Sequence, residues 1–245
     1  MTVAYSHPPH PSTSKQAEVQ TSSSTSLESQ GTTERDPHLL PSFELKEHTV
    51  PVLYLPPLLS SLPERIPAPA LSPAHPPLIT ETRLPDIDPV SLSLHKALHH
   101  FRPLTSDYAE IPYGEAFNWL DLNLPEEEER EWYCVAFRSQ RKAGSDGDAL
   151  YEADKFAHEE AVQNGGLIMY WYGIPNPETG MNLATCIWQS RQHAVAANSR
   201  PHHIKAMRLA AQSYEVYSLN RYVLRKSKGE RHVTIEPYTG GEVGW

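Results

Sequence analysis

The regular alternation of apolar and polar positions is clearest in the second half of the chain. Residues 131–141 carry apolar side chains on both alternations, one beginning at Trp132 and the other at Tyr133. A strand with two apolar faces is typical of the centre of a sheet that is covered on both sides. Residues 149–164 instead repeat apolar positions at helical spacing, and Gly165 follows them as a stop signal, so this stretch predicts a helix.

The elements that follow have an order that indicates the fold class. Apolar spacing and turn residues predict four further strands and two short helices. The strands are 167–174, 183–189, 214–225 and 232–237, and the helices are 190–197 and 201–212. With the first strand and helix, the order is β-α-β-β-α-β followed by one hairpin strand. This order predicts an α+β fold, a ferredoxin-like split βαβ sheet with two flanking helices, whose opposite sheet face needs a cover.

Polar residues at helix ends predict where two of the helices begin. Asp88 is expected to cap a helix over about 88–102. Ser199 is expected to cap the helix over 201–212 in the same way. The buried face of that second helix is expected to hold Ile204, Met207, Ala210 and Ala211.

Composition divides the chain into an N-terminal and a C-terminal half. Of 23 prolines, 17 precede Thr105, whereas all five tryptophans follow Phe117. A Pro- and Ser-rich stretch with few aromatic residues cannot bury enough apolar area to offset its ordering entropy. Apolar residues between 50 and 59 are interrupted by proline, which predicts an extended strap that either docks another protein or covers its own domain. We therefore expect a disordered low-complexity tail (1–42), a Pro-rich strap with one helix (43–104), a compact α+β domain (105–238) and a tail (239–245).

Charge and the absence of long apolar runs narrow the function classes. Residues 1–131 carry 8 basic and 19 acidic side chains, and residues 132–245 carry 13 and 11. A nearly neutral folded domain behind an acidic leader makes nucleic acid an unexpected partner. No window approaches the ~18 apolar residues of a membrane-spanning helix, and no secretory leader is visible. We therefore expect no membrane partner and a cytoplasmic location, with the nucleus as a further option.

Chemistry that depends on metals or cofactors has no signature in the sequence. There is no phosphate-binding loop, no dinucleotide-binding glycine pattern and no Cys/His set with zinc spacing, so we predict no metal and no cofactor. Cys134 and Cys186 lie inside apolar runs and are expected to be buried thiols. His95 and His99 have the spacing of metal ligands on a helix, but no acidic base accompanies them, and we expect both to lie on the surface.

Five stretches of the C-terminal half resemble a known family. They are EWYCVAFRSQR, YEADKFAHEEAVQNGGLIMYWYG, PNPETGMNLATCIW, SRQHAVAANSRPHHIKAMRLAAQSYEVYSL and VTIEPY. They look like a fungal family of the UPF ("uncharacterised protein family") series, in which this block follows a variable N-terminus. The resemblance covers about 108–238 and implies no particular activity.

A looser resemblance is to the dimeric α+β barrel superfamily, which includes antibiotic-biosynthesis monooxygenase-like and haem-degrading proteins. It rests on Trp188-Gln-Ser190, where a predicted strand runs into a helix, and on the later Arg200-Pro-His202-His203. This chain departs from the pattern by lengthening the helical connection and adding a fifth strand. The resemblance implies a barrel that forms a homodimer.

Polar residues on aromatic walls form the best candidate site. A concave, mostly apolar pocket with a few polar groups is the usual form of a small-molecule site. A neutral histidine beside it can act as a base near neutral pH, which makes His158 and His203 the candidate catalytic residues. The alternative is that both lie on helix surfaces and that the aromatic residues are simply core. The candidate pocket-binding residues are Arg138, Tyr170, Tyr172, Trp188, Arg191 and Asn198.

Three functions are compatible with these patterns. The first is a ligand-binding or self-associating α+β barrel module with a disordered N-terminal arm, whose partner is a small apolar ligand or a second copy. The second is a cofactor-independent enzyme that acts on a small aromatic or polyketide-like substrate. The third is phosphate or RNA recognition through the basic hairpin 221–231. A solvated edge that discourages strand aggregation explains these charges more simply.

Overall fold

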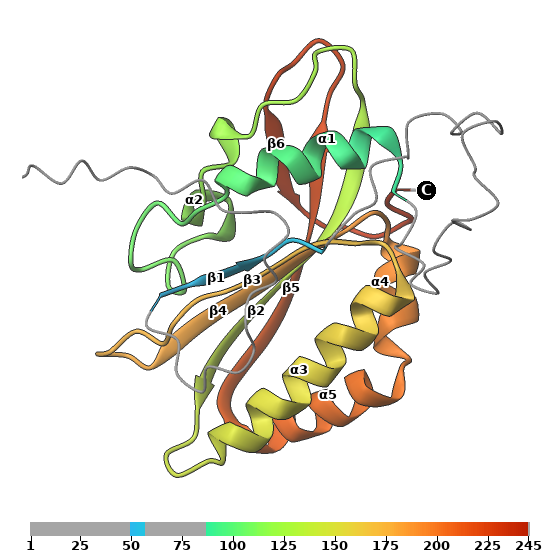
Figure 1. The fold of residues 1–245 in the computed structure, drawn as a ribbon. Coiled ribbons are helices and arrows are strands. Elements are labelled where there is room, and N and C mark those ends of the chain that lie inside the picture. The colour runs from blue at the N-terminus through green and yellow to red at the C-terminus, as the bar shows by residue number, and fades with distance from the viewer. Residues whose placement is uncertain (1–49, 57–86, 245) are drawn as a thin grey trace, which may run out of the picture. The chain divides into compact units, whose positions relative to one another are not determined.

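The computed structural model describes residues 50–56 and 87–244. The predicted tail 1–42 and most of the predicted strap lie outside these residues, as does Trp245. The described residues form one six-stranded antiparallel sheet with helices on both faces (Figure 1). Among them, no helix combines the length and the apolar character that crossing a membrane requires.

The elements of the C-terminal half occur in the predicted order. The strands are β1 (Val52–Tyr54), β2 (Arg130–Arg141), β3 (Leu167–Tyr172), β4 (Met181–Trp188), β5 (Tyr214–Lys226) and β6 (Val233–Pro237). The α-helices are α1 (Pro89–Ala97), α2 (Tyr113–Ala116), α3 (Gly147–Asn164), α4 (Arg191–Asn198) and α5 (Pro201–Ser213). Short 3-10 helices span Leu98–His100 and Trp119–Asp121.

The sheet has the split βαβ topology that the element order predicts. Its strand order is β1-β3-β4-β2-β5-β6. Helix α3 connects β2 to β3, but β4 lies between these two strands and pairs with both. Strand β5 pairs along the other side of β2, from Arg130↔Lys226 to Arg141↔Tyr214. The predicted fold class is therefore confirmed, with β6 and β1 added at the two edges of the sheet.

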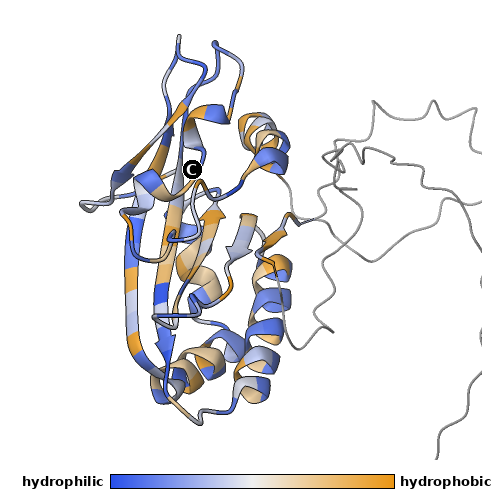
Figure 2. Ribbon diagram, turned by 90° about the vertical axis from the view of Figure 1, so that its left-hand side faces the viewer, coloured by the Kyte–Doolittle hydropathy of each residue, from blue (hydrophilic) through white to orange (hydrophobic). Residues whose placement is uncertain are grey.

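Strand β2 has two buried faces, as its double alternation predicts. Trp132 and Cys134 belong to one apolar core, and Tyr133 and Val135 belong to the other. Because side chains alternate along a strand, the same residues supply both cores at once. Helices and strands carry hydrophobic and hydrophilic stretches side by side, as expected of elements with one buried face or more (Figure 2).

Residues 87–124 cover the sheet face that carries Trp132. In α1, the Ser91 hydroxyl accepts a hydrogen bond from the Trp132 indole nitrogen at 2.8 Å. The Tyr113 hydroxyl lies 2.6 Å from the hydroxyl of Thr185 on β4. The face opposite α3, α4 and α5 is thus closed by the chain's own residues 87–124, without a second copy (Figure 1).

Of the two predicted helix N-caps, the structure has the one at Asp88 but not the one at Ser199. The Asp88 carboxylate accepts a hydrogen bond from the Ser91 amide at 2.9 Å, which is the predicted cap. The helix that follows is shorter than 88–102, because it tightens into a 3-10 turn after Ala97. The prediction for Ser199 is wrong, since its hydroxyl donates to the Ala196 carbonyl at 2.7 Å and closes α4 instead.

Several other residues differ from the prediction in whether they are buried or exposed. His95 is buried, not on the surface as predicted. Its Nε2 lies 3.1 Å from the carbonyl oxygen of Pro56, which belongs to a distant segment. Burial lowers the pKa of His95 to about 4 and keeps the ring neutral. On α5, Met207 and Ala211 are exposed although a buried face was predicted for them. Val243, which lies within the predicted tail 239–245, is buried beside α4.

Candidate functional site

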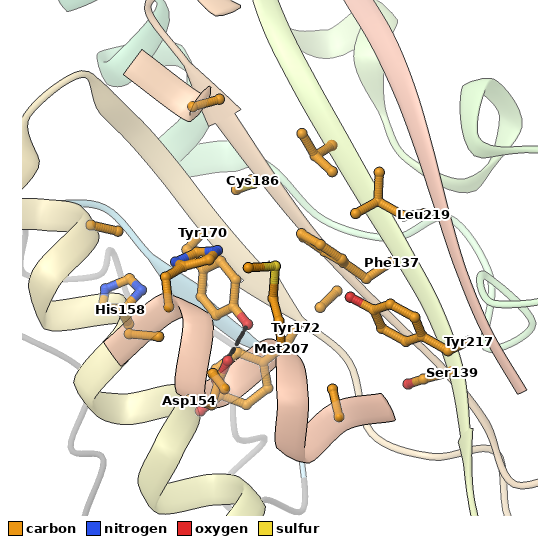
Figure 3. A pocket seen from close by; sticks show the side chains of 18 of the residues that line it. Phe137, Ser139, Asp154, His158, Tyr170, Tyr172, Cys186, Met207, Tyr217 and Leu219 are labelled. Carbon is orange, nitrogen blue, oxygen red and sulfur yellow. Dashed lines mark hydrogen bonds between the residues drawn. The ribbon is translucent and has the colours of Figure 1, made fainter. Parts of the chain in front are cut away.

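A cavity of about 1230 Å³ lies between the sheet face that carries Tyr133 and the helices α3, α4 and α5. Small-molecule pockets usually occupy roughly 300–1,000 Å³, so this space can hold a drug-sized molecule or a larger one. Described side chains from strands β2 to β6 and from helices α3, α4 and α5 line it, and Figure 3 shows part of the lining.

The alternation of the strands brings aromatic side chains into the cavity. Tyr133, Val135 and Phe137 point from β2 toward it, because every second side chain of a strand lies on the same face. Strand β3 adds Tyr170 and Tyr172. These residues make one side of the cavity largely aromatic.

The helices close the opposite side with mostly small or flexible residues. Ala157 and Ala161 of α3 and Ala206 of α5 line the cavity, and Met207 projects between them and the strands (Figure 3). Because alanines fill little space, the helices cover the sheet without filling the gap. A flexible methionine thioether adapts readily to different ligand shapes.

Among the described residues, one carboxylate faces the cavity, that of Asp154 on α3. The Tyr170 hydroxyl donates to it and lies 3.3 Å from both carboxylate oxygens (Figure 3). Burial raises the pKa of Asp154 from 3.8 to about 6, although the hydrogen bond from Tyr170 acts in the opposite direction. The group therefore changes its charge close to neutral pH, whereas an ordinary aspartate does so near pH 4.

Further tyrosines surround Asp154. Burial, followed by the charge of Asp154, raises the pKa of both Tyr151 and Tyr214. Burial raises the pKa of Tyr217 to about 12. The rings of Tyr214 and Tyr217 are stacked, with centroids 5.6 Å apart. The phenols are thus neutral at physiological pH and offer hydroxyl groups and ring faces to a ligand.

Both predicted catalytic histidines lie on the cavity wall. His158 is buried between the rings of Tyr54 and Tyr170, at centroid distances of 4.0 and 5.0 Å. Burial lowers its pKa to about 3, so it is neutral and only weakly basic. His203 is half-buried, and burial lowers its pKa as well. Its Nδ1 has no hydrogen-bond partner among the described residues.

Three other predicted pocket residues line the end of the cavity near α4. The Trp188 indole donates to the Cys186 sulfur at 3.0 Å. Arg191 pairs with Glu242 at 3.1 Å, and Asn198 lines the wall at the end of α4. With the two histidines, Tyr170 and Tyr172, the structure brings seven of the eight predicted site residues to this cavity.

Arg138 is the predicted pocket residue that lies elsewhere. Its guanidinium donates to the carbonyls of Ala109 and Ile111, at 2.9 and 2.8 Å, on the other side of the sheet. Arg138 lies an even number of positions after Trp132 along β2, and such residues share a face of the sheet. Its side chain therefore belongs to the face covered by residues 87–124. It holds the covering segment in place.

Metal and thiol chemistry have no support in the described residues. These contain no group of three or more His, Cys, Asp or Glu residues placed to hold a metal ion. Both cysteines are buried. Burial raises the pKa of Cys186 to about 12, so it is not a reactive thiolate at neutral pH.

Two basic residues of the hairpin 221–231, Arg225 and Arg231, pair with carboxylates, and Lys226 is buried. Arg225 pairs with Glu131 at 3.0 Å and with Glu236 at 3.5 Å. Lys226 is fully buried, and its ammonium donates to two backbone carbonyls at 3.0 Å. Arg221 and Lys228 are exposed, so the hairpin keeps only part of its positive charge for contact with a phosphate.

Sequence reasoning missed Asp154, although a signal for it exists. Asp154 lies one turn after Leu150 and just under a turn before Ala157, both of which belong to the apolar stripe of α3. A carboxylate at the edge of a buried helical stripe faces an apolar wall. The sequence does not reveal that a cavity separates this side of α3 from the sheet.

Comparisons with known proteins give one clear relationship. A family model described as PB2B2.08-like matches residues 74–237. The UPF0643 protein PB2B2.08 of Schizosaccharomyces pombe is 35% identical over an alignment of 152 residues, and the match covers 56% of this chain and 69% of that protein.

Several solved structures resemble parts of the chain. A putative monooxygenase from Lactobacillus acidophilus is 9% identical, with a TM-score of 0.35, over 46% of this chain and 56% of that one. A putative antibiotic biosynthesis monooxygenase from Nitrosomonas europaea is 14% identical, with a TM-score of 0.32, over 37% and 94%. SnoaB, a cofactor-independent oxygenase from Streptomyces nogalater, is 8% identical, with a TM-score of 0.34, over 41% and 99%.

Proposed function

This chain belongs to the PB2B2.08-like family, and we propose that it binds a small, mainly apolar molecule in the cavity between its sheet and helices α3 to α5. The observation that carries the proposal is the cavity itself. It has about 1230 Å³ of space beside aromatic walls, whereas protein interiors normally contain few voids larger than a water molecule.

The lining indicates how such a ligand is held. Phe137, Tyr170 and Tyr172 supply aromatic surface from the strands, and Met207 supplies an adaptable apolar contact from α5. Asp154 and the tyrosine hydroxyls are the polar groups that orient the ligand. A few fixed polar groups on a wide apolar wall are the usual pattern of a specific small-molecule site.

A fluorescent apolar probe tests the proposal. Anthracenylmethanol, titrated into the full-length protein, is expected to bind with a change in its emission. Ala184 lines the cavity, opposite Tyr172 and Phe137 in the sheet register. In Ala184→Phe the added ring fills part of the space, and affinity is expected to fall about tenfold or more.

Ala196→Phe is the matched control. Ala196 is exposed on α4 and lies outside the cavity, so this variant should bind the probe as the unchanged protein does. Absence of binding by the unchanged protein, or equal binding by Ala184→Phe, rejects the proposal.

A second candidate is a cofactor-independent enzyme that acts on a small aromatic or polyketide-like substrate in the same cavity. The observation that favours it is a carboxyl group with a pKa of about 6 facing the space where a substrate would lie. The base in this version is Asp154, because the pKa of His158 is only about 3. Asp154 would accept a proton from an acidic C–H or O–H group of the substrate.

Deuterium exchange tests the enzymatic candidate. Tetralone, an enolisable bicyclic ketone, is incubated with the protein in D2O, and loss of its acidic C–H signal is followed by NMR. Faster exchange with the protein than with buffer, abolished in Asp154→Asn, is expected. Exchange at the buffer rate removes this candidate and leaves ligand binding untouched.

A further inference from the structure

The charge of Asp154 has no cationic partner in the described part of the chain. It is the one acidic residue among the described residues that line the cavity. None of the ion pairs formed by described residues includes it. Carboxylates held away from water are normally paired with a cation or stabilised by several hydrogen bonds.

The hydrogen bond to Asp154 leaves most of its acceptor capacity unused. Two carboxylate oxygens can accept about four hydrogen bonds, but the described residues supply only the Tyr170 hydroxyl. The hydroxyl has one proton for both carboxylate oxygens, and its oxygen lies 3.3 Å from each of them, longer than the ~2.7 Å of a good O–H···O bond. The carboxylate is therefore able to take a second, stronger donor from the cavity.

The three arginines on the cavity wall are engaged elsewhere or exposed. Arg141 donates to the Ser145 carbonyl at 2.7 Å and to its hydroxyl at 3.2 Å. Arg191 pairs with Glu242. Arg221 is exposed and lies opposite Val135 in the sheet register. None of the three neutralises Asp154.

Aromatic rings surround the place where a counter-ion of Asp154 would lie. The ring centroids of Tyr170 and Tyr172 are 5.7 Å apart. Tyr214 and Tyr217 belong to β5, and the charge of Asp154 contributes to the raised pKa of both phenols. Cations bind favourably over the faces of aromatic rings. A carboxylate among tyrosine rings is suited to an ammonium group.

We infer that the cavity selects a mainly apolar ligand that carries a protonated amine, with the ammonium group placed between the Asp154 carboxylate and the surrounding tyrosine rings. The inference rests on the proposed binding function and specifies the chemical class of the ligand. The ammonium donates to the oxygen lone pairs that Tyr170 leaves free, and the apolar body lies along Phe137 and Met207.

Three probes with one ring system test the inference on the full-length protein: anthracenylmethylamine, anthracenylmethanol and anthracenecarboxylate. At neutral pH the amine is expected to bind about 10- to 100-fold more tightly than the alcohol, the range of one hydrogen bond to a charged group. The carboxylate is expected to bind more weakly than the alcohol. Asp154→Asn should reduce the affinity for the amine to that for the alcohol and leave the alcohol unaffected.

Glu152→Gln is the matched control. It removes one carboxylate from the exposed side of the same helix and should keep the full preference for the amine. The inference is overturned by equal binding of amine and alcohol, by a preference that persists in Asp154→Asn, or by tightest binding of the carboxylate through the arginines. If even the alcohol does not bind, the proposed function fails and the inference fails with it.

Discussion

Replacing Asp154 by asparagine is expected to stabilise the ligand-free protein at neutral pH. The pKa of Asp154 rises from 3.8 to about 6 because the folded protein leaves the carboxyl group half-buried, with less water around it than in the unfolded chain. Asparagine has the same shape and carries no charge, and its side-chain oxygen can still accept the Tyr170 hydroxyl. The substitution therefore removes a desolvation cost without removing the hydrogen bond.

The size and the sign of the effect follow from the two pKa values. Between pH 3.8 and about 6, the folded protein keeps a proton on Asp154 that the unfolded chain has released, so the unchanged protein loses stability as pH rises through this window. A difference of about two pKa units at roughly 1.4 kcal/mol each amounts to about 3 kcal/mol. Asp154→Asn should thus match the unchanged protein near pH 4 and exceed it by about 3 kcal/mol above pH 6.

Urea unfolding between pH 4 and 8 measures this difference directly. The free energy of unfolding is compared at each pH for the dialysed unchanged protein, Asp154→Asn and the control Glu152→Gln. The buried histidines His95 and His158 titrate in all three proteins, so their contribution cancels in the differences. A difference that stays constant with pH, or that grows toward acid pH, would refute the reasoning.

Three further outcomes are expected. Tyr170→Phe should raise the pKa of Asp154 above about 6, because the hydroxyl bond lowers it; an unchanged carboxyl titration by NMR contradicts this. Tyr54→Ala removes the ring that lies 4.0 Å from His158, so the pKa of His158 should rise from about 3 toward the usual 6.5; imidazole shifts that stay the same argue against the packing. Sedimentation should give a monomer, because residues 87–124 cover the second sheet face; a dimer would require another interface.

The fold class was predictable because its signals are local. The double alternation from Trp132 and Tyr133 is contained in one strand, and the βαβ order follows from the succession of short apolar periods. Gly165 ends α3 with a φ of 85°, a left-handed conformation that glycine adopts readily. Each of these features depends on residues close together in the sequence.

The cover of the second face and the burial of His95 depend on distant contacts. Ser91 meets Trp132 across 41 positions, and His95 meets Pro56 across 39. No periodicity within α1 reveals which residues will contact it.

The candidate site was predictable in its aromatic part but not in its charge. Tyr170, Tyr172 and Trp188 belong to recognisable strands, and the pairing of those strands brings them together. Asp154 is polar in a helix where many residues are polar, and only the hollow beside it gives it a role. The prediction for Arg138 differed because parity along β2 places it on the face opposite Tyr133.

The position of residues 87–124 in the chain has a consequence for biosynthesis. This segment leaves the ribosome after β1 but before β2 to β6, and its Tyr113 can contact Thr185 only once the 72 positions between them have been synthesised. At roughly 5–20 residues per second, translation of that interval takes on the order of several seconds. During this time the apolar side of α1 and of the 3-10 turn that follows it, with Leu94 and Leu98, is open to chaperones and to other nascent chains.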